Sequence, residues 1–127
     1  MQLQAHHAAW GQPFQGRIAT QMEHIEKALQ IYDPALHSQS ANTYGNHDVG
    51  VCAHFHKSII LWSMGYADQS RRGGELTVKL AGEINHLPTR IQILHQINWL
   101  NFFNGDARAV HDMASKAIDE SMEIGLF

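Results

Sequence analysis

The chain has a single cysteine, Cys52, and few positively charged residues. Its 127 residues include nine lysines and arginines against twelve aspartates and glutamates, which gives a formal net charge of −3. One cysteine excludes a disulfide within the chain and is compatible with a reducing compartment. The basic residues are scattered, with Arg71 and Arg72 the only adjacent pair. Because no basic stripe is present, we expect no nucleic-acid partner.

Long apolar runs are also missing. The longest, SIILWSM at 58–64, is far shorter than the roughly 20 residues that a membrane-spanning helix needs. The first ten residues, MQLQAHHAAW, combine neither the positive charge nor the apolar core of a secretory signal. We therefore expect no membrane partner and a cytoplasmic location.

Apolar residues do recur at helical spacing, and strand-like alternation is absent. The stripes predict helices over about 17–32, 48–64, 68–84, 89–103 and 107–124, preceded by a short helix near 3–10. Residues 34–47 show little periodicity and are expected to pack on the body or to hold a short helix. The predicted fold class is all-α, with residues 1–127 forming one domain.

The stripes also predict which residues form the core. Helix 48–64 presents Val51, Phe55, Ile59 and Trp62; helix 68–84 presents Leu76, Leu80 and Ile84; helix 107–124 presents Val110, Met113, Ala117 and Met122. Helix 89–103 is apolar on most of its circumference and is expected to be buried on two sides. The aromatic residues Trp10, Trp62, Trp99, Phe102 and Phe103 are expected in the core. Gly73 and Gly74 lie inside a helix, where glycine is unfavourable by about 1 kcal/mol relative to alanine, so we expect a kink or a close helix contact there.

The helices form pairs. Two apolar helices end in short glycine turns at Gly65 and Gly105, forty residues apart, and each is followed by a thinner amphipathic helix. This spacing lies in the range of α-solenoid repeats. The sequence therefore predicts about three antiparallel hairpins, 3–32, 48–85 and 88–124, stacked as a short solenoid.

Four stretches resemble a known family: LQAHHAAW (3–10), HIEKALQIYDPALH (24–37), YGNHDVGVCAHFHKSIILWSMGYADQ (44–69) and INHLPTRIQILHQINWLNFF (84–103). They are similar, in family order, to the tetratricopeptide-like helical region that follows the ATPase modules of large bacterial adenylate and guanylate cyclases and related regulators. Trp62, Gly65 and Tyr66 fit the repeat pattern, whereas Gly73 and Gly74 depart from it. The resemblance implies a helical-repeat regulatory region, and no ATPase or cyclase residues are present to imply catalysis.

The GNHD motif at 45–48 raises a competing hypothesis, because the same letters form one block of binuclear metallophosphoesterases. Two metal ions need six or seven ligands from several blocks, and no Asp-x-His lies upstream of Gly45. The hydrolase hypothesis is therefore set aside. Asp48 is expected to cap a helix, and Gly45 and Gly50 to permit backbone turns.

Ten histidines are many for this length. His47, His54 and His56 lie within ten residues, and helix stacking could return His6 and His7 nearby. Since residues two apart on a helix point in directions about 200° apart, His54 and His56 cannot share an ion. We expect the histidines to serve capping, packing and solvation rather than metal binding, with His47 and His54 as the candidate ligands if an ion is held. Cys52, on an apolar helix face, is expected in the core.

Two functions remain open. The first is a non-enzymatic protein-interaction or regulatory module without a cofactor, in which a groove lined by Lys57, His95, Asn98 and Asn101 binds an extended peptide. The alternative is a small metal- or ligand-binding helical protein that uses the histidines of 47–56. We also expect a homodimer, because Met122, Leu126 and Phe127 near one end and Trp10 near the other would leave apolar repeat ends uncovered.

Overall fold

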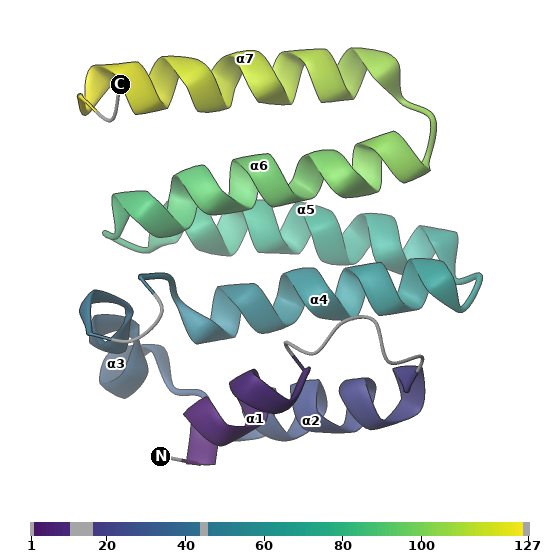
Figure 1. The fold of residues 1–127 in the computed structure, drawn as a ribbon, viewed down its shortest axis with the longest axis vertical. Coiled ribbons are helices and arrows are strands. Elements are labelled where there is room, and N and C mark those ends of the chain that lie inside the picture. Colours follow the sequence, from purple (N-terminus) through teal and green to yellow (C-terminus); the bar gives the residue numbers. More distant parts are fainter. Residues whose placement is uncertain (1, 11–16, 44–45, 126–127) are drawn as a thin grey trace.

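The computed structural model describes residues 2–10, 17–43 and 46–125 (Figure 1). All regular elements in these residues are helices. They are α1 (Gln2–Trp10), α2 (Ile18–Ile31), α3 (Pro34–His37), the 3₁₀ helix η1 (Ser38–Asn42), α4 (Val49–Ser63), α5 (Ala67–Glu83), α6 (Leu87–Phe103) and α7 (Ala107–Glu123). The predicted all-α class is confirmed, and the helix bounds lie close to those expected. In these residues no helix combines the length and the apolar character required to cross a membrane.

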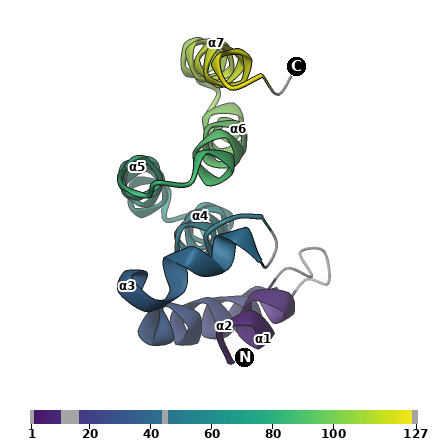
Figure 2. The ribbon, with the colours of Figure 1, turned by 90° about the vertical axis from the view of Figure 1, so that its left-hand side faces the viewer.

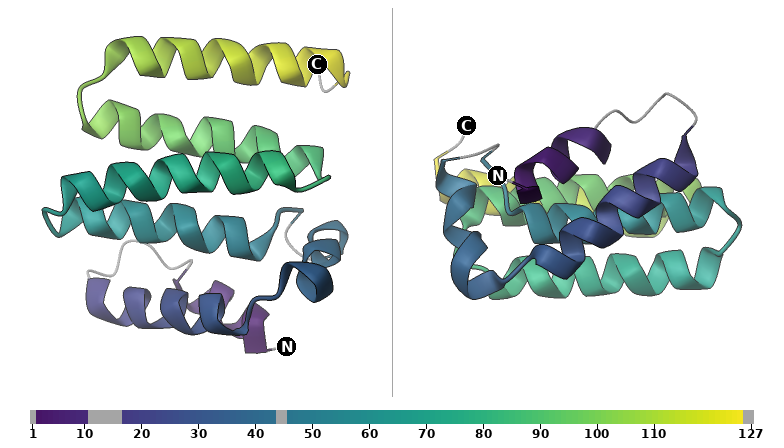
Figure 3. Two further views of the ribbon diagram at one scale, coloured as in Figure 1. Left: turned by 180° about the vertical axis from the view of Figure 1, so that it is seen from behind. Right: turned by 90° about the horizontal axis from the view of Figure 1, so that it is seen from below.

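The helices are stacked in chain order, with α1 and α2 at one end and α7 at the other (Figure 1). Seen end on, α4 and α6 lie towards one side of the stack and α5 towards the other (Figure 2). From below, α1 and α2 run obliquely to the roughly parallel axes of α4 to α7 (Figure 3). Helix α4 is central, because it contacts α1, α2, α5 and α6.

Side-chain caps explain where two of the long helices begin. Asp48 Oδ1 accepts the backbone N–H of Val51 at 2.9 Å, and Asp106 Oδ1 accepts that of Ala109 at 2.9 Å. Each bond satisfies one of the amides that have no partner inside the helix. The expectation that Asp48 caps a helix is confirmed.

The same turn ends α4 and α6. After α4, Gly65 N donates to Trp62 O and Tyr66 N to Leu61 O, both at 2.9 Å. After α6, the residues forty positions later repeat these bonds at 3.0 Å, from Gly105 to Phe102 and from Asp106 to Asn101. Both glycines have positive φ, 89° and 71°, as this type of helix end requires.

The buried residues form two clusters on either side of α4. One joins α1, α2 and one face of α4 through Leu3, Trp10, Ile25, Ala28, Val49, Cys52, Ala53 and Ile60. The other joins the opposite face of α4 to α5 and α6 through Val51, Phe55, Ala81, Ile93, Ile97 and Leu100. The predicted stripe of α4 therefore lies in the second cluster.

Small residues form the fully buried face of α5, and two residues of the predicted stripe, Leu80 and Ile84, are half-buried against the second cluster. The buried positions are Ser70, Gly74, Thr77 and Ala81, whereas Leu76 is exposed. A Cβ at Gly73 would overlap Ser58 Oγ of α4, and one at Gly74 would lie 3.1 Å from Leu100 Cδ1 of α6. The glycines therefore permit close helix contacts, as expected, and α5 continues through them without interruption.

Helix α6 is not buried on two sides, which corrects the sequence prediction. Ile93, Leu94, Ile97 and Leu100 are buried, but Trp99, Phe102 and Phe103 are exposed by 52%, 66% and 38%. On α7, Met122 is also exposed. These helices stand near one end of the stack, so part of their apolar surface has no helix against it in the described residues.

Candidate functional site

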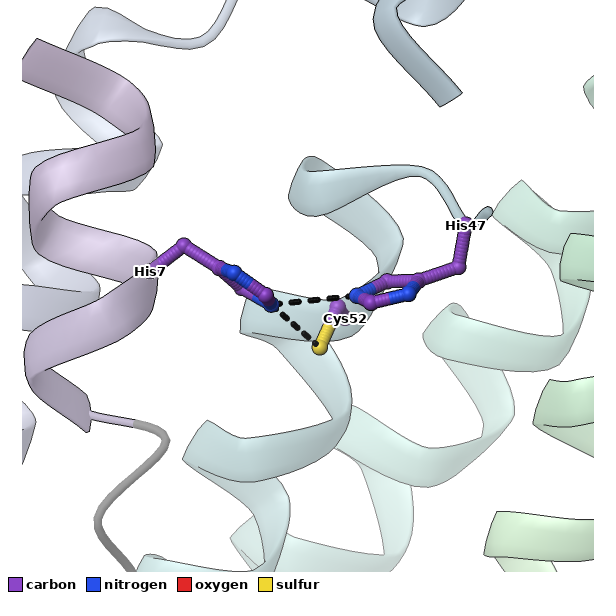
Figure 4. Close-up of side chains that lie close together, drawn as sticks. All are labelled: His7, His47 and Cys52. Atoms are coloured by element: carbon purple, nitrogen blue, oxygen red, sulfur yellow. Dashed lines mark hydrogen bonds between the residues drawn. The ribbon is translucent and has the colours of Figure 1, made fainter. Parts of the chain in front are cut away.

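Three side chains from separate segments converge beside the N-terminal half of α4 (Figure 4). His7 belongs to α1, His47 lies just before α4, and Cys52 lies in the first turn of α4. Nε2 of His7 is 3.0 Å from Nε2 of His47 and 3.7 Å from Sγ of Cys52. One possible ligand atom from each residue lies within 4.8 Å of the other two. These distances suit residues that share one ion.

Burial controls the protonation of this cluster. It lowers the pKa of His7 to about 4, with a further contribution from the nearby rings of His47 and His56. It also raises the pKa of the Cys52 thiol to about 12. At neutral pH, His7 is therefore an uncharged imidazole, and Cys52 is a thiol that must lose its proton before it can bind metal.

Trp10 lies against the cluster and is only 1% exposed. Its ring meets that of His7 edge-on, with 5.1 Å between the ring centroids. Its indole Nε1 is buried and makes no hydrogen bond of standard geometry with a described residue. The Trp10 indole lowers the pKa of the Cys52 thiol and so opposes part of the effect of burial.

His56 is a neighbour of the cluster with a defined tautomer. Its Nδ1 lies 2.9 Å from the carbonyl oxygen of Cys52 and 3.4 Å from Sγ of Cys52. A carbonyl oxygen can only accept, so Nδ1 of His56 carries the proton. Burial lowers the pKa of His56.

The other histidines of the predicted set lie apart from the cluster. His54 lines a hollow with Leu29, Tyr32, Gly50 and Leu80, away from Cys52. His6 pairs with His24 of α2, with 2.9 Å between their Nδ1 atoms. In the described residues, the possible ligands that converge on His47 are His7 and Cys52, and His54 is not among them.

The described part of the GNHD motif serves as helix architecture. Asp48 is fully buried, and its Oδ2 accepts a hydrogen bond from Tyr32 Oη at 2.7 Å. Its backbone N–H donates to Thr89 Oγ1 at 2.8 Å. Gly50 lies inside α4 rather than in a turn, and a Cβ there would overlap the Tyr32 ring. Gly45, which was expected to permit a turn, lies outside the described residues.

The candidate groove residues do not form one ladder. Lys57 of α4 pairs with Glu26 of α2 at 3.5 Å and thus faces α2. His95 is exposed on α6. Asn98 and Asn101 are half-buried and bond to each other at 3.4 Å. Lys57 is therefore separated from the three residues of α6.

An exposed aromatic cluster joins α4 to α6 beside His95 and Asn98. Trp62 of α4 stacks on Phe103 of α6, with ring centroids 4.8 Å apart, and Trp99 and Phe102 lie about the same ring at 6.2 and 6.0 Å. Trp62 is half-buried and the other three are exposed. Three of the five aromatic residues expected in the core are therefore on the surface.

The residues suggested for a dimer contact have different positions. Trp10 is buried within the chain and presents no surface to a second copy. Met122 is 65% exposed on α7. Leu126 and Phe127 lie outside the described residues.

No family model matches this chain, and no curated protein or solved structure does so either. The tetratricopeptide-like resemblance therefore stays a prediction. The approach of His7 to His47 through helix stacking was anticipated from the sequence, whereas Cys52, expected only in the core, was missed as their neighbour because no local motif joins it to them.

Proposed function

We propose that this chain is a non-enzymatic, tetratricopeptide-like helical-repeat module that binds a protein partner across α4 and α6. The observation that carries the proposal is the exposed aromatic cluster of Trp62, Trp99, Phe102 and Phe103. Aromatic side chains are enriched at the centres of protein interfaces, where a few of them supply most of the binding free energy. An exposed cluster of apolar side chains is typical of a binding site, whereas single exposed apolar residues are common on any protein surface.

The repeated helix ends support the repeat part of the proposal. Helices α4 and α6 end in the same hydrogen-bonded glycine turn, with every equivalent residue shifted by forty. Each is followed by a helix that packs back on it, α5 on α4 and α7 on α6. A repeat of this length, with contacts to the next pair, is the organisation of a helical solenoid.

The repeat also explains why the aromatic residues differ in exposure. Phe102 occupies in α6 the position that Trp62 occupies in α4, directly before the glycine turn. Trp62 is covered by Phe103 of the following pair, whereas Phe102 is 66% exposed. A partner segment that covered Phe102 would reproduce the stacking that Trp62 already has. Burying one such ring contributes about 2–3 kcal/mol before the entropic cost of association.

Polar groups beside the aromatic cluster suit a peptide backbone. His95 lies one helical turn before Trp99, and Asn98 lies on the same side of α6. Imidazole and amide groups can both donate and accept hydrogen bonds. An extended partner could therefore place apolar side chains on the aromatic rings and satisfy its backbone groups on His95 and Asn98.

Affinity capture with a double variant tests this function. The chain is immobilised and incubated with lysate of the cells that produce it, and the bound proteins are quantified by mass spectrometry. Trp99→Ser with Phe102→Ser should lose the specific partner, whereas Ile118→Ser, which removes a similarly exposed apolar side chain from α7, should retain it. Equal capture by all three proteins would contradict the proposal. Sedimentation equilibrium separates a second copy of this chain from a different protein as the partner.

A further inference from the structure

We propose that His7, His47 and Cys52 form a binding site for a thiophilic divalent ion of the Zn²⁺ class, with one coordination position left for an exchangeable ligand. This inference is independent of the aromatic cluster, because the three residues lie on the opposite side of α4. The three ligands come from α1, from the segment before α4, and from α4 itself (Figure 4).

The distances fit a tetrahedral site after a small adjustment. Zinc bonds of about 2.0 Å to nitrogen and about 2.3 Å to sulfur place tetrahedral ligand atoms about 3.3–3.6 Å apart. The nitrogen atoms of His7 and His47 are 3.0 Å apart, and His7 nitrogen is 3.7 Å from the Cys52 sulfur. The remaining separation, from His47 to Cys52, is no more than 4.8 Å and would shorten by about 1 Å through ring rotation.

The donor set selects the class of ion. Two imidazole nitrogens and one thiolate suit zinc and the other late transition metals, whereas magnesium and calcium require oxygen ligands. The carboxylate of Asp48, the residue after His47, already accepts bonds from Val51 N and from Tyr32 Oη. Oxygen ligation by Asp48 would break the cap of α4 and is therefore disfavoured.

Trp10 supplies the second observation that points to a ligand. Its indole N–H is buried and makes no hydrogen bond of standard geometry with a described residue, and its ring packs in the same buried cluster as Cys52. A neutral thiol is a weak acceptor, so an N–H in this position is poorly satisfied. A metal-bound thiolate carries negative charge and accepts such a bond, which also tunes the metal–sulfur bond. The buried indole is therefore explained if Cys52 binds metal.

Binding exchanges one proton for one metal–sulfur bond. The S–H bond of Cys52 breaks, the sulfur lone pair binds the ion, and the proton leaves to the buffer. His7 contributes the lone pair of its Nε2, the nitrogen that faces His47 and Cys52. The ion also links α1 to α4, so binding should slow hydrogen exchange of the α1 amides.

Cobalt titration is the test, with the full chain purified without a histidine tag and treated with a chelator. We expect one Co²⁺ per chain, with d–d bands of a tetrahedral complex and a thiolate-to-cobalt charge-transfer band that disappears when Zn²⁺ is added. Cys52→Ala should abolish the charge-transfer band. His7→Gln and His47→Gln should each weaken binding about 100-fold or more, since losing a ligand costs at least as much as losing an outer-shell partner.

Trp10→Phe and two histidine controls sharpen the test. Trp10→Phe keeps an aromatic ring but removes the N–H, so it should weaken binding about 10-fold and shift the charge-transfer band. His54→Gln and His111→Gln, which lie outside the cluster, should bind as the unmodified chain does. Circular dichroism checks that each variant keeps its helical content. A wild-type spectrum without a thiolate band would overturn the proposal, because it would mean adventitious binding by imidazoles alone. Unchanged affinity in both His7→Gln and His47→Gln would do the same.

Discussion

The pairs α4–α5 and α6–α7 share a glycine turn and similar lengths, but they are packed very differently. Eight residues of α4 and four of α5 are buried, against five of α6 and one of α7. The residues forty positions apart show why. Ser58 of α4 meets Gly73 of α5, whereas the equivalent residues of the second pair are Asn98 and Met113, both half-buried.

The comparison shows that two helix pairs with the same repeat pattern can differ in how much of their surface is buried. The first pair uses small residues to bring α5 against α4, and it has α2 and α6 as further neighbours. The second pair carries larger side chains and lies near an end of the stack. The first pair therefore contributes more buried residues than the second, and the exposed residues of the aromatic cluster lie on α6 of the second pair.

Removing each helix cap should give the largest contrast between the pairs. Asp48→Ala deletes a fully buried carboxylate and leaves Val51 N–H and Tyr32 Oη without their acceptor, so we expect a loss of about 3 kcal/mol. Asp106→Ala deletes an exposed cap that makes the same backbone bond, with an expected loss of about 1 kcal/mol. Urea unfolding of both variants measures the two values. Equal losses of unfolding free energy would mean that the burial of Asp48 adds nothing to the stabilisation by its cap bond.

Replacing a glycine of α5 by a larger residue should be costly where α5 contacts α4 and tolerated where α5 faces solvent. Gly73→Val forces side-chain atoms against Ser58 and should destabilise the chain by about 2–3 kcal/mol. Gly82→Val lies on the same helix with no atom within 4 Å of the added Cβ, so its effect should stay within about 0.5 kcal/mol. Thermal unfolding followed by circular dichroism compares them. A Gly73→Val variant as stable as the unmodified chain would contradict the close contact between α4 and α5 at this residue.

The equivalent aromatic residues Trp62 and Phe102 should differ in their effect on stability. Trp62→Ala removes a half-buried ring that stacks on Phe103, and we expect a loss of about 2 kcal/mol. Phe102→Ala removes a largely exposed ring, and the free energy of unfolding should change by less than about 0.5 kcal/mol. Chemical denaturation measures both, and a large loss for Phe102→Ala would place its ring in the core instead.

Acidification should produce the smallest effect, and it should arise in α1 and α4. The pKa of His7 is lowered from 6.5 to about 4, and burial also lowers those of His54 and His56. Between these pH values the unfolded chain binds more protons than the folded chain, so stability falls as the pH drops from 6.5 towards 4. Because the rings are partly exposed, we expect a total loss of about 1 kcal/mol. Unfolding in the presence of a chelator measures this slope.

A triple variant provides the control for the pH experiment. His7→Gln, His54→Gln and His56→Gln together should flatten the slope, whereas His111→Gln, which replaces an exposed ring, should leave it unchanged. A slope that persists in the triple variant would assign the acid sensitivity to other groups.

Much of the fold could be predicted because helices carry local signals. The spacing of apolar residues located each long helix, Asp48 marked the start of α4, and Gly65 and Gly105 marked the ends of α4 and α6. These features act within a few residues along the chain, so they can be recognised without knowing which helices pack together. The all-α class follows from them.

The sequence alone thus determined which segments are helical and that one turn repeats after forty residues. Only the tertiary structure decided which faces of those helices are covered. It buried the small residues of α5 rather than Leu76, left Phe102 in solvent, and brought His7 of α1 to His47 and Cys52. The physical reason is that burial and ligand convergence depend on contacts between segments far apart in the chain, whereas helical periodicity fixes only the directions of side chains about their own axis.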